Sequence, residues 1–393
     1  MLLERISNYF KTNHVIILIM SYLSIGSFSA GFISPAMIHL QFYFNTSSQF
    51  TQSVVIIYLL GYLIGQLVYG HLSEKYSPIK LIKSGLLINL AGVLISLFSL
   101  FLSNFYLMLL GRFVSSIGLS SGLTCAFNLI KNQFSKEKSD YVLSWSLTSF
   151  TLSIFSSILI GSYLIYYTSV VFIFYALFLH GVLSCLSVFT LKDTKPKEAT
   201  TKYTSPTTIH YWHLIKHSLL MGLFSAVGYC YFSSSAIYSM IDLGLDADAY
   251  GKWSILGGLG MILSKFVSDR LRQYITQASL ILLSLAFFVM TLMSLQFFNL
   301  SIGENHIVYF VSVFFLFLLS GVMYPLAAQA IIRSSYHSEK VSGYMSFINL
   351  GSALIALYLM SHLPLSIIDS FIFVLLAFAS LSFCIYFICT KHS

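Results

Sequence analysis

Residues 109–118, LLGRFVSSIG, place one arginine, Arg112, inside an otherwise apolar run. A guanidinium at membrane depth costs about 3 kcal/mol on insertion scales, so a partner must compensate it. All 13 Asp and Glu residues map to hydrophilic loops or to the ends of apolar runs, which leaves no carboxylate at that depth. Three interpretations stay open. In the first, Arg112 bonds neighbouring carbonyls and hydroxyls and stabilises its helix. In the second, it relays protons through water. In the third, it faces a cavity and binds a carboxylate or phosphate ligand, because a planar guanidinium matches the geometry of these groups.

Other polar side chains recur at helical spacing inside the apolar runs. Tyr58, Tyr62 and Gln66 are four residues apart and share one helix face, and the run 229–240, YCYFSSSAIYSM, repeats this pattern. Such faces either line a pocket or pack between helices with their hydroxyls bonded across. As a pocket they would suit a polar or amphipathic organic molecule around one fixed positive charge. The candidate substrate-binding residues are Arg112, Tyr58, Tyr62, Gln66, Tyr231, Ser235, Tyr238, Gln329 and Asn349.

Membrane helices must position these side chains. Of the 393 residues, 57% are hydrophobic and 9% are charged, whereas soluble domains have about 25% charged residues. The apolar runs are long enough to cross about 30 Å of hydrocarbon as helices, and they lack the short alternation of β-barrel strands. We predict an all-α membrane protein with twelve transmembrane helices, at residues 14–39, 50–71, 81–102, 105–130, 141–164, 169–191, 214–240, 251–268, 276–298, 306–332, 341–361 and 370–390.

The positive charges predict the orientation, because loops rich in Lys and Arg stay in the cytoplasm. With both termini inside, all of the 21 Lys and Arg except Lys252 and Arg112 fall in cytoplasmic segments. The net charge of +8 reflects this asymmetry and not a nucleic-acid-binding surface. Short loops favour a bacterial inner membrane. The acidic residues expected outside are Asp242, Asp246, Asp248, Glu304 and Asp369.

A hydrophilic stretch divides the chain in two. It is rich in Lys, Thr, Pro and Ser, which is typical of a flexible linker. We predict an N-terminal six-helix bundle at 1–191, a cytoplasmic linker at 192–213 and a C-terminal six-helix bundle at 214–393. A weak internal repeat supports this division, since residues 73–75, Ser-Glu-Lys, correspond to residues 268–270, Ser-Asp-Arg, about half a chain later.

Several motifs resemble the major facilitator superfamily. Residues 70–75, GHLSEK, resemble the signature between its second and third helices, and Arg112 with Gly118 resembles its fourth-helix element. Residues 31–37, 229–251 and 321–330 resemble drug/proton antiporters of the bicyclomycin-resistance type. The resemblance implies two pseudo-symmetric six-helix bundles that open alternately to each side. It also implies a charged cytoplasmic gate at Gly70, Glu74, Lys75, Asp269 and Arg270.

The sequence departs from those antiporters in helix 1, where Gly31 stands in place of the usual aspartate. With no buried carboxylate, the groups that could carry a coupling proton are His39, His71 and His180, and the coupling ion stays open. No Walker, HExxH or CxxC motif indicates an enzyme, a metal site or a cofactor.

We therefore predict a secondary transporter, an exporter of a small anionic organic metabolite such as a siderophore. It would act as a monomer in a lipid bilayer. The alternatives are a multidrug/proton antiporter, or a sensor or scaffold on the same fold that moves nothing.

Overall fold

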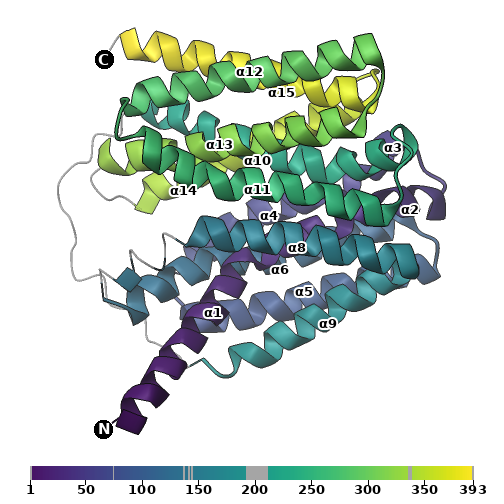
Figure 1. The fold of residues 1–393 in the computed structure, drawn as a ribbon. Helices are drawn as coiled ribbons and strands as arrows, with labels where there is room; N and C mark the ends of the chain where they lie inside the picture. The colour runs from purple at the N-terminus through teal and green to yellow at the C-terminus, as the bar shows by residue number, and fades with distance from the viewer. Residues whose placement is uncertain are drawn as a thin grey trace. The chain divides into compact units, whose positions relative to one another are not determined.

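The computed structural model describes residues 2–73, 75–135, 138–139, 142, 145–191, 211–334 and 339–391. These residues form helices and no strand, so the all-α prediction is confirmed. Figure 1 shows the helices in chain order. They are α1 (Leu2–Ile33), η1 (Ser34–Ala36), α2 (Met37–Tyr43), α3 (Ser48–Thr51), α4 (Ser53–Leu72), α5 (Pro78–Phe101), α6 (Phe105–Gln133), α8 (Ser146–Tyr167), α9 (Val170–Val188), α10 (Tyr211–Ile241), α11 (Ala247–Leu271), α12 (Gln277–Ile302), α13 (His306–Ser334), α14 (Glu339–His362) and α15 (Ile367–Lys391).

The first predicted span is one apolar run broken at Pro35. Proline lacks a backbone N–H and cannot continue the α-helical hydrogen-bond pattern. The chain forms the 3₁₀ turn η1 at this point and then resumes as α2. The second span starts where the Ser47 hydroxyl accepts a hydrogen bond from the Phe50 N–H at 3.1 Å, which caps α3.

Each of the twelve predicted runs corresponds to helix in the part of the chain that the structure describes. Eleven helical segments there are long and apolar enough to cross a membrane. The helix that falls outside this set is α11, which has charged residues in both its first and last turns. The linker predicted at 192–213 lies largely outside the described residues, as does Glu74.

The chain divides into two compact units, which we describe separately. Unit 1 comprises Met1–Phe32, Ile57–Ser157 and Thr168–Tyr203. In this unit α5 packs closely along α6, because small residues face one another across the contact. A Cβ on Gly118 would collide with the backbone of Gly85 and Asn89, and one on Gly111 would collide with the backbone of α5. These glycines allow the two helices to approach to backbone contact.

Unit 2 comprises Ile33–Ile56, Ile158–Tyr167 and Thr204–Ser393. It therefore includes η1, α2 and α3 together with the six helices from α10 to α15. α10 is its central element, because it packs against α13, α14 and α15 and also against η1 and α2 (Figure 1). The compact unit thus joins part of the first span to the C-terminal helices.

Candidate functional site

Arg112 is a buried arginine of α6, with 2% of its surface exposed. Its Nη1 donates to the Ser29 hydroxyl at 3.2 Å, and its Nη2 lies 3.5 Å from the Ser29 carbonyl oxygen. The guanidinium also stacks over the Tyr58 ring, with Cζ 4.2 Å from the ring centroid. Unit 1 therefore holds Arg112 between α1 and α4.

Tyr58 is fixed in position by α1. Its hydroxyl donates to the Gly26 carbonyl at 2.7 Å, and the side chain is fully buried. The Tyr62 ring stacks beside it at a centroid distance of 6.3 Å. Gly26 has no side chain to obstruct this arrangement, since a Cβ there would lie 2.5 Å from the Tyr62 ring. The structure thus brings together three of the predicted binding residues, Arg112, Tyr58 and Tyr62.

The charge of Arg112 has no acidic partner among the described residues. Its contacts are a hydroxyl, a carbonyl and an aromatic face, and its buried Nε–H donates to no described group. Neutral acceptors and a ring quadrupole only partly replace the hydration of a guanidinium. The site therefore offers a positive charge with unused donor capacity at membrane depth.

The predicted residues of the seventh helix lie in unit 2. The Tyr231 hydroxyl donates to the Ser254 hydroxyl at 2.7 Å, and the Ser254 hydroxyl donates to the Tyr250 carbonyl at 2.8 Å. Tyr238 packs against Tyr309 at a centroid distance of 5.0 Å. The Ser235 hydroxyl lies among the Tyr231, Tyr250 and Tyr309 phenols. These side chains form a buried cluster of tyrosines and hydroxyls between α10, α11 and α13.

The remaining predicted binding residues are dispersed. Asn349 is buried and accepts a hydrogen bond from the Ser225 hydroxyl at 2.8 Å, which joins α14 to α10. Gln66 and Gln329 are half-buried, and the buried Gln66 Oε1 accepts no hydrogen bond from a described residue. Among these three, Asn349 has a helix-packing contact, whereas Gln66 retains a free acceptor.

The predicted gate residues lie at helix ends. Gly70 is half-buried in the last turn of α4, and Lys75 is exposed in the turn before α5. Asp269 and Arg270 are exposed at the end of α11, where Arg270 lies 5.5 Å from the centre of the Tyr274 ring. Their gating role stays a prediction.

The candidate proton carriers differ in environment. His180 stacks on Phe28 at a centroid distance of 4.4 Å, so it fills a packing position in unit 1. His71 is exposed at the end of α4. His39 in α2 is half-buried and lies near the backbone of Pro35, four residues earlier in the chain.

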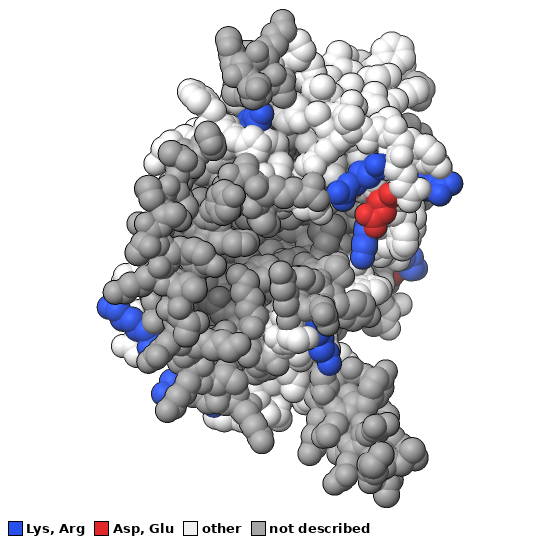
Figure 2. Space-filling model, turned by 90° about the vertical axis from the view of Figure 1, so that its left-hand side faces the viewer, with Lys and Arg blue, Asp and Glu red and all other residues white. Residues whose placement is uncertain are grey.

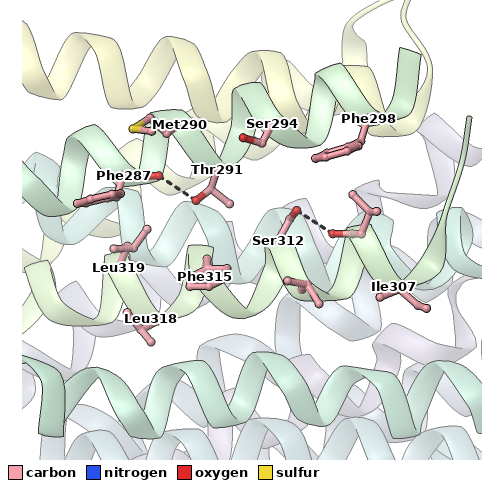
Figure 3. Close-up of a pocket in the computed structure, with 12 residues that line it drawn as sticks. Phe287, Met290, Thr291, Ser294, Phe298, Ile307, Ser312, Phe315, Leu318 and Leu319 are labelled. Carbon is pink, nitrogen blue, oxygen red and sulfur yellow. Dashed lines mark hydrogen bonds between the residues drawn. The ribbon is translucent and has the colours of Figure 1, made fainter. Parts of the chain in front are cut away.

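A cavity of about 600 Å³ lies along α12 and α13 in unit 2. Figure 3 shows that apolar side chains such as Phe287, Met290 and Phe315 line it. Its Thr291 and Ser312 hydroxyls donate to carbonyls of their own helices at 2.8 and 2.7 Å. No described charged residue lines the cavity, so it has no counter-charge with which to recognise an anion.

Two serines that are central to this geometry, Ser29 and Ser34, were not predicted from the sequence as site residues. Ser29 is the hydrogen-bond partner of Arg112, and the Tyr250 hydroxyl bonds the Ser34 hydroxyl at 2.9 Å. Ser29 lies two residues before the GFISPAM stretch of the first span and Ser34 lies inside it, so this stretch offered the only local signal. The partners are 83 and 216 residues apart in the chain, so spacing within one helix could not reveal them.

The described residues thus define a multi-pass helical membrane protein with a buried arginine site. The family model described as Major Facilitator Superfamily matches residues 17–357, and the chain belongs to this family. A protein described as an uncharacterized transporter of Rickettsia bellii (strain RML369-C) is 26% identical over 259 residues, 63% of this chain. The match spans 62% of that relative's length.

Solved structures share the fold over nearly the whole chain. A D-xylose–proton symporter superposes with a TM-score of 0.72 at 11% identity and covers 94% of this chain and 97% of its own. A bacterial homologue of the human lysosomal transporter Spinster, inward-facing and unoccupied, gives a TM-score of 0.70 at 12% identity, with 96% and 97% covered. The same homologue in its inward-facing, occupied conformation also gives 0.70, at 11% identity, with 97% of each chain covered. These likenesses confirm the predicted superfamily fold.

Proposed function

We propose that this protein is a secondary transporter that exports a small organic anion by alternating access. One observation carries the proposal. The buried Arg112 guanidinium has no carboxylate partner in the described part of the chain and retains a free Nε–H. A carboxylate or phosphate ligand would supply the missing counter-ion and accept two parallel hydrogen bonds.

The surroundings of Arg112 suit such a ligand. Tyr58 and Tyr62 form an aromatic wall on α4, and Ser29 provides a hydroxyl on α1. Because Arg112 is only 2% exposed here, a ligand reaches it when the helices around it separate. We assign Arg112, Tyr58 and Tyr62 to the anion site, with Gln66 one turn further along α4.

The packing around η1, at one end of unit 2, supports alternating access. This turn packs on α10 and α11, and the Ser34–Tyr250 hydrogen bond joins the first span to α11. We propose that the structure is closed at this end and that opening it breaks that bond. Tyr231, Ser235 and Tyr238 line the route when it opens, and Gln329 and Asn349 contribute from α13 and α14.

The distribution of charge supports an orientation with this closed end outside. The acidic residues Asp242, Asp246 and Glu304 lie at the same end of unit 2 as η1, whereas Lys265 and Arg270 lie towards the other end of α11. Lysine and arginine predominate over acidic side chains among the described residues on the face in Figure 2. We propose that this basic face is cytoplasmic in a bacterial inner membrane, with Lys75, Asp269 and Arg270 in the gate.

The anion assignment favours a secreted carboxylate metabolite, such as a siderophore, over a cationic drug. A cationic substrate calls for an acidic pocket, and the described residues around Arg112 include no acid. Among the similar proteins, the symporter couples D-xylose to protons. We extend neither its sugar nor its coupling ion to this chain, which has Gly31 where the antiporters have an aspartate.

The test compares metabolites in culture medium from a deletion strain and its parent. We expect an anionic metabolite to be depleted outside and accumulated inside the deletion strain. Purified protein in liposomes should then move that metabolite, and Arg112→Ala should abolish the flux while the protein still inserts. Arg272→Ala, at the half-buried end of α11, is the matched control. Equal flux in both variants, or binding without flux in the unaltered protein, would contradict the proposal, and the latter would indicate a sensor.

A further inference from the structure

A polar cavity of about 510 Å³ lies at the end of unit 2 that includes α2 and α3. Its walls come from the α2–α3 segment, the end of α10 and the turn between α14 and α15. The cavity is distinct from the Arg112 site, which lies in unit 1. Its polar lining residues include Gln41, Ser48, Gln52, Asp242, Ser366 and Ser370.

Gln52 lines this cavity and carries a buried acceptor without a described partner. The side chain is 3% exposed, and its Oε1 accepts no hydrogen bond from any described residue. A buried acceptor left unpaired costs about 1–3 kcal/mol. Gln41 differs, because its Oε1 accepts from the Ser48 hydroxyl at 2.9 Å. The free oxygen of Gln52 therefore calls for a ligand that donates a hydrogen bond.

The charge around the cavity is negative. Asp242 lines the cavity, and partial burial raises the pKa of its carboxyl. Partial burial, with the charges of Asp242 and Asp369, also raises the pKa of the Glu304 carboxyl. Among the charged residues described nearby, Lys252 is paired with Asp248. A positively charged ligand would relieve the repulsion between these carboxylates.

Asp369 already accepts hydrogen bonds from neighbouring side chains, so ligand recognition would depend on Asp242 and Gln52. Asp369 accepts hydrogen bonds from the Ser366 hydroxyl at 2.6 Å and from Gln296 Nε2 at 3.0 Å. The described residues hold no group of three His, Cys, Asp or Glu side chains that could bind a metal ion. The volume also falls in the range of about 300–1,000 Å³ typical of small-molecule sites.

We propose that this cavity binds a small organic ammonium ion, with Asp242 as its counter-ion and Gln52 as its hydrogen-bond acceptor. The ligand touches the α2–α3 segment on one side and α10 with the α14–α15 turn on the other. It therefore stabilises the packing of α2 on α10 and of α3 on α14.

An effect of this ligand on transport rests on the proposed alternating access. A ligand that binds only the closed arrangement shifts the equilibrium by a factor of 1 + [L]/Kd, about elevenfold at ten times its Kd. An amine outside the cell would thus hold the outer end closed and slow transport. Binding itself depends only on the cavity.

The binding test uses the full-length protein in lipid nanodiscs with radiolabelled putrescine, a primary diammonium ion. We expect saturable binding that excess unlabelled putrescine displaces and the neutral 1,4-butanediol does not. Asp242→Asn and Gln52→Met should each weaken binding at least tenfold. Gln52→Glu should strengthen it, a direction that misfolding cannot produce. Asp248→Asn, which removes an acid outside the cavity, is the control and should leave binding unchanged. Absence of saturable binding, or equal binding in all variants, would overturn the site.

The closing effect is measured separately. Spin labels at Gln49 in α3 and Leu365 in the α14–α15 turn, which both line the cavity, should show a larger short-distance population with putrescine. Binding with an unchanged distance distribution would overturn the closing role. Because neither readout uses the transported metabolite, failure of the anion-export proposal would leave the binding result interpretable.

Discussion

Replacing Arg112 by methionine separates a structural role from a ligand-binding role. Methionine keeps an unbranched apolar stem of similar length and removes the charge. The substitution therefore leaves the packing against Tyr58 largely filled. It also removes both contacts to Ser29.

The contacts of Arg112 give the expected magnitude. A hydrogen bond from a charged donor contributes about 1.5–3 kcal/mol, but the contact at 3.5 Å is at the limit of such bonds. A desolvated cation–π contact contributes about 2 kcal/mol. These gains, roughly 4 kcal/mol, are offset by about 3 kcal/mol for placing the charge at membrane depth. The balance is near zero, so Arg112→Met should change the free energy of unfolding by less than about 2 kcal/mol.

Transport should respond very differently. Removing one partner of a buried, hydrogen-bonded charge pair costs about 2–5 kcal/mol, which corresponds to at least a 30-fold loss in anion affinity. Stability can be followed in nanodiscs with a thiol-reactive dye in a background that keeps Cys125 and Cys230 alone, because these two thiols are buried, whereas Cys185 is half-buried and Cys384 is exposed. Flux of the identified metabolite is measured in liposomes, with Arg272→Met as the control. A stability loss above about 4 kcal/mol with retained flux would refute the reasoning, because Arg112 would then be a structural residue.

Two further predictions rest on contacts within the units, and a third rests on the proposed gate. Gly118→Ala should destabilise the protein by about 1–3 kcal/mol in thermal unfolding, because the added Cβ would collide with the α5 backbone. Gly70→Ala is the control and should not destabilise it, because the space around Gly70 is open. Equal effects of the two substitutions would contradict the α5–α6 contact. Tyr250→Phe removes the hydroxyl that joins α11 to η1. It should lower the free energy of unfolding by about 1 kcal/mol and favour outward opening, which would be measured as greater labelling of cysteines placed beside η1. Asp269→Asn should also alter the inward–outward balance, and identical cysteine labelling on both faces would count against the gate.

Some of this protein could be predicted from local sequence alone. Runs of about 20 apolar residues predicted the helices, because backbone groups in hydrocarbon must be satisfied within the segment. Pro35 breaks the first span for an equally local reason, since it lacks an N–H. The unusual charge of Arg112 was likewise visible in the chain.

The partners of these residues were decided by tertiary structure. In a membrane helix, apolar side chains face both lipid and neighbouring helices, so hydrophobic periodicity does not tell which faces meet. Ser29 was therefore not predictable as the partner of Arg112, nor Tyr250 as the partner of Ser34. The same ambiguity hid the joining of Ile33–Ile56 to the C-terminal helices. The sequence by itself determined where the helices run and that Arg112 needs a counter-charge, whereas packing determined which groups surround that charge and how much of it they leave uncompensated.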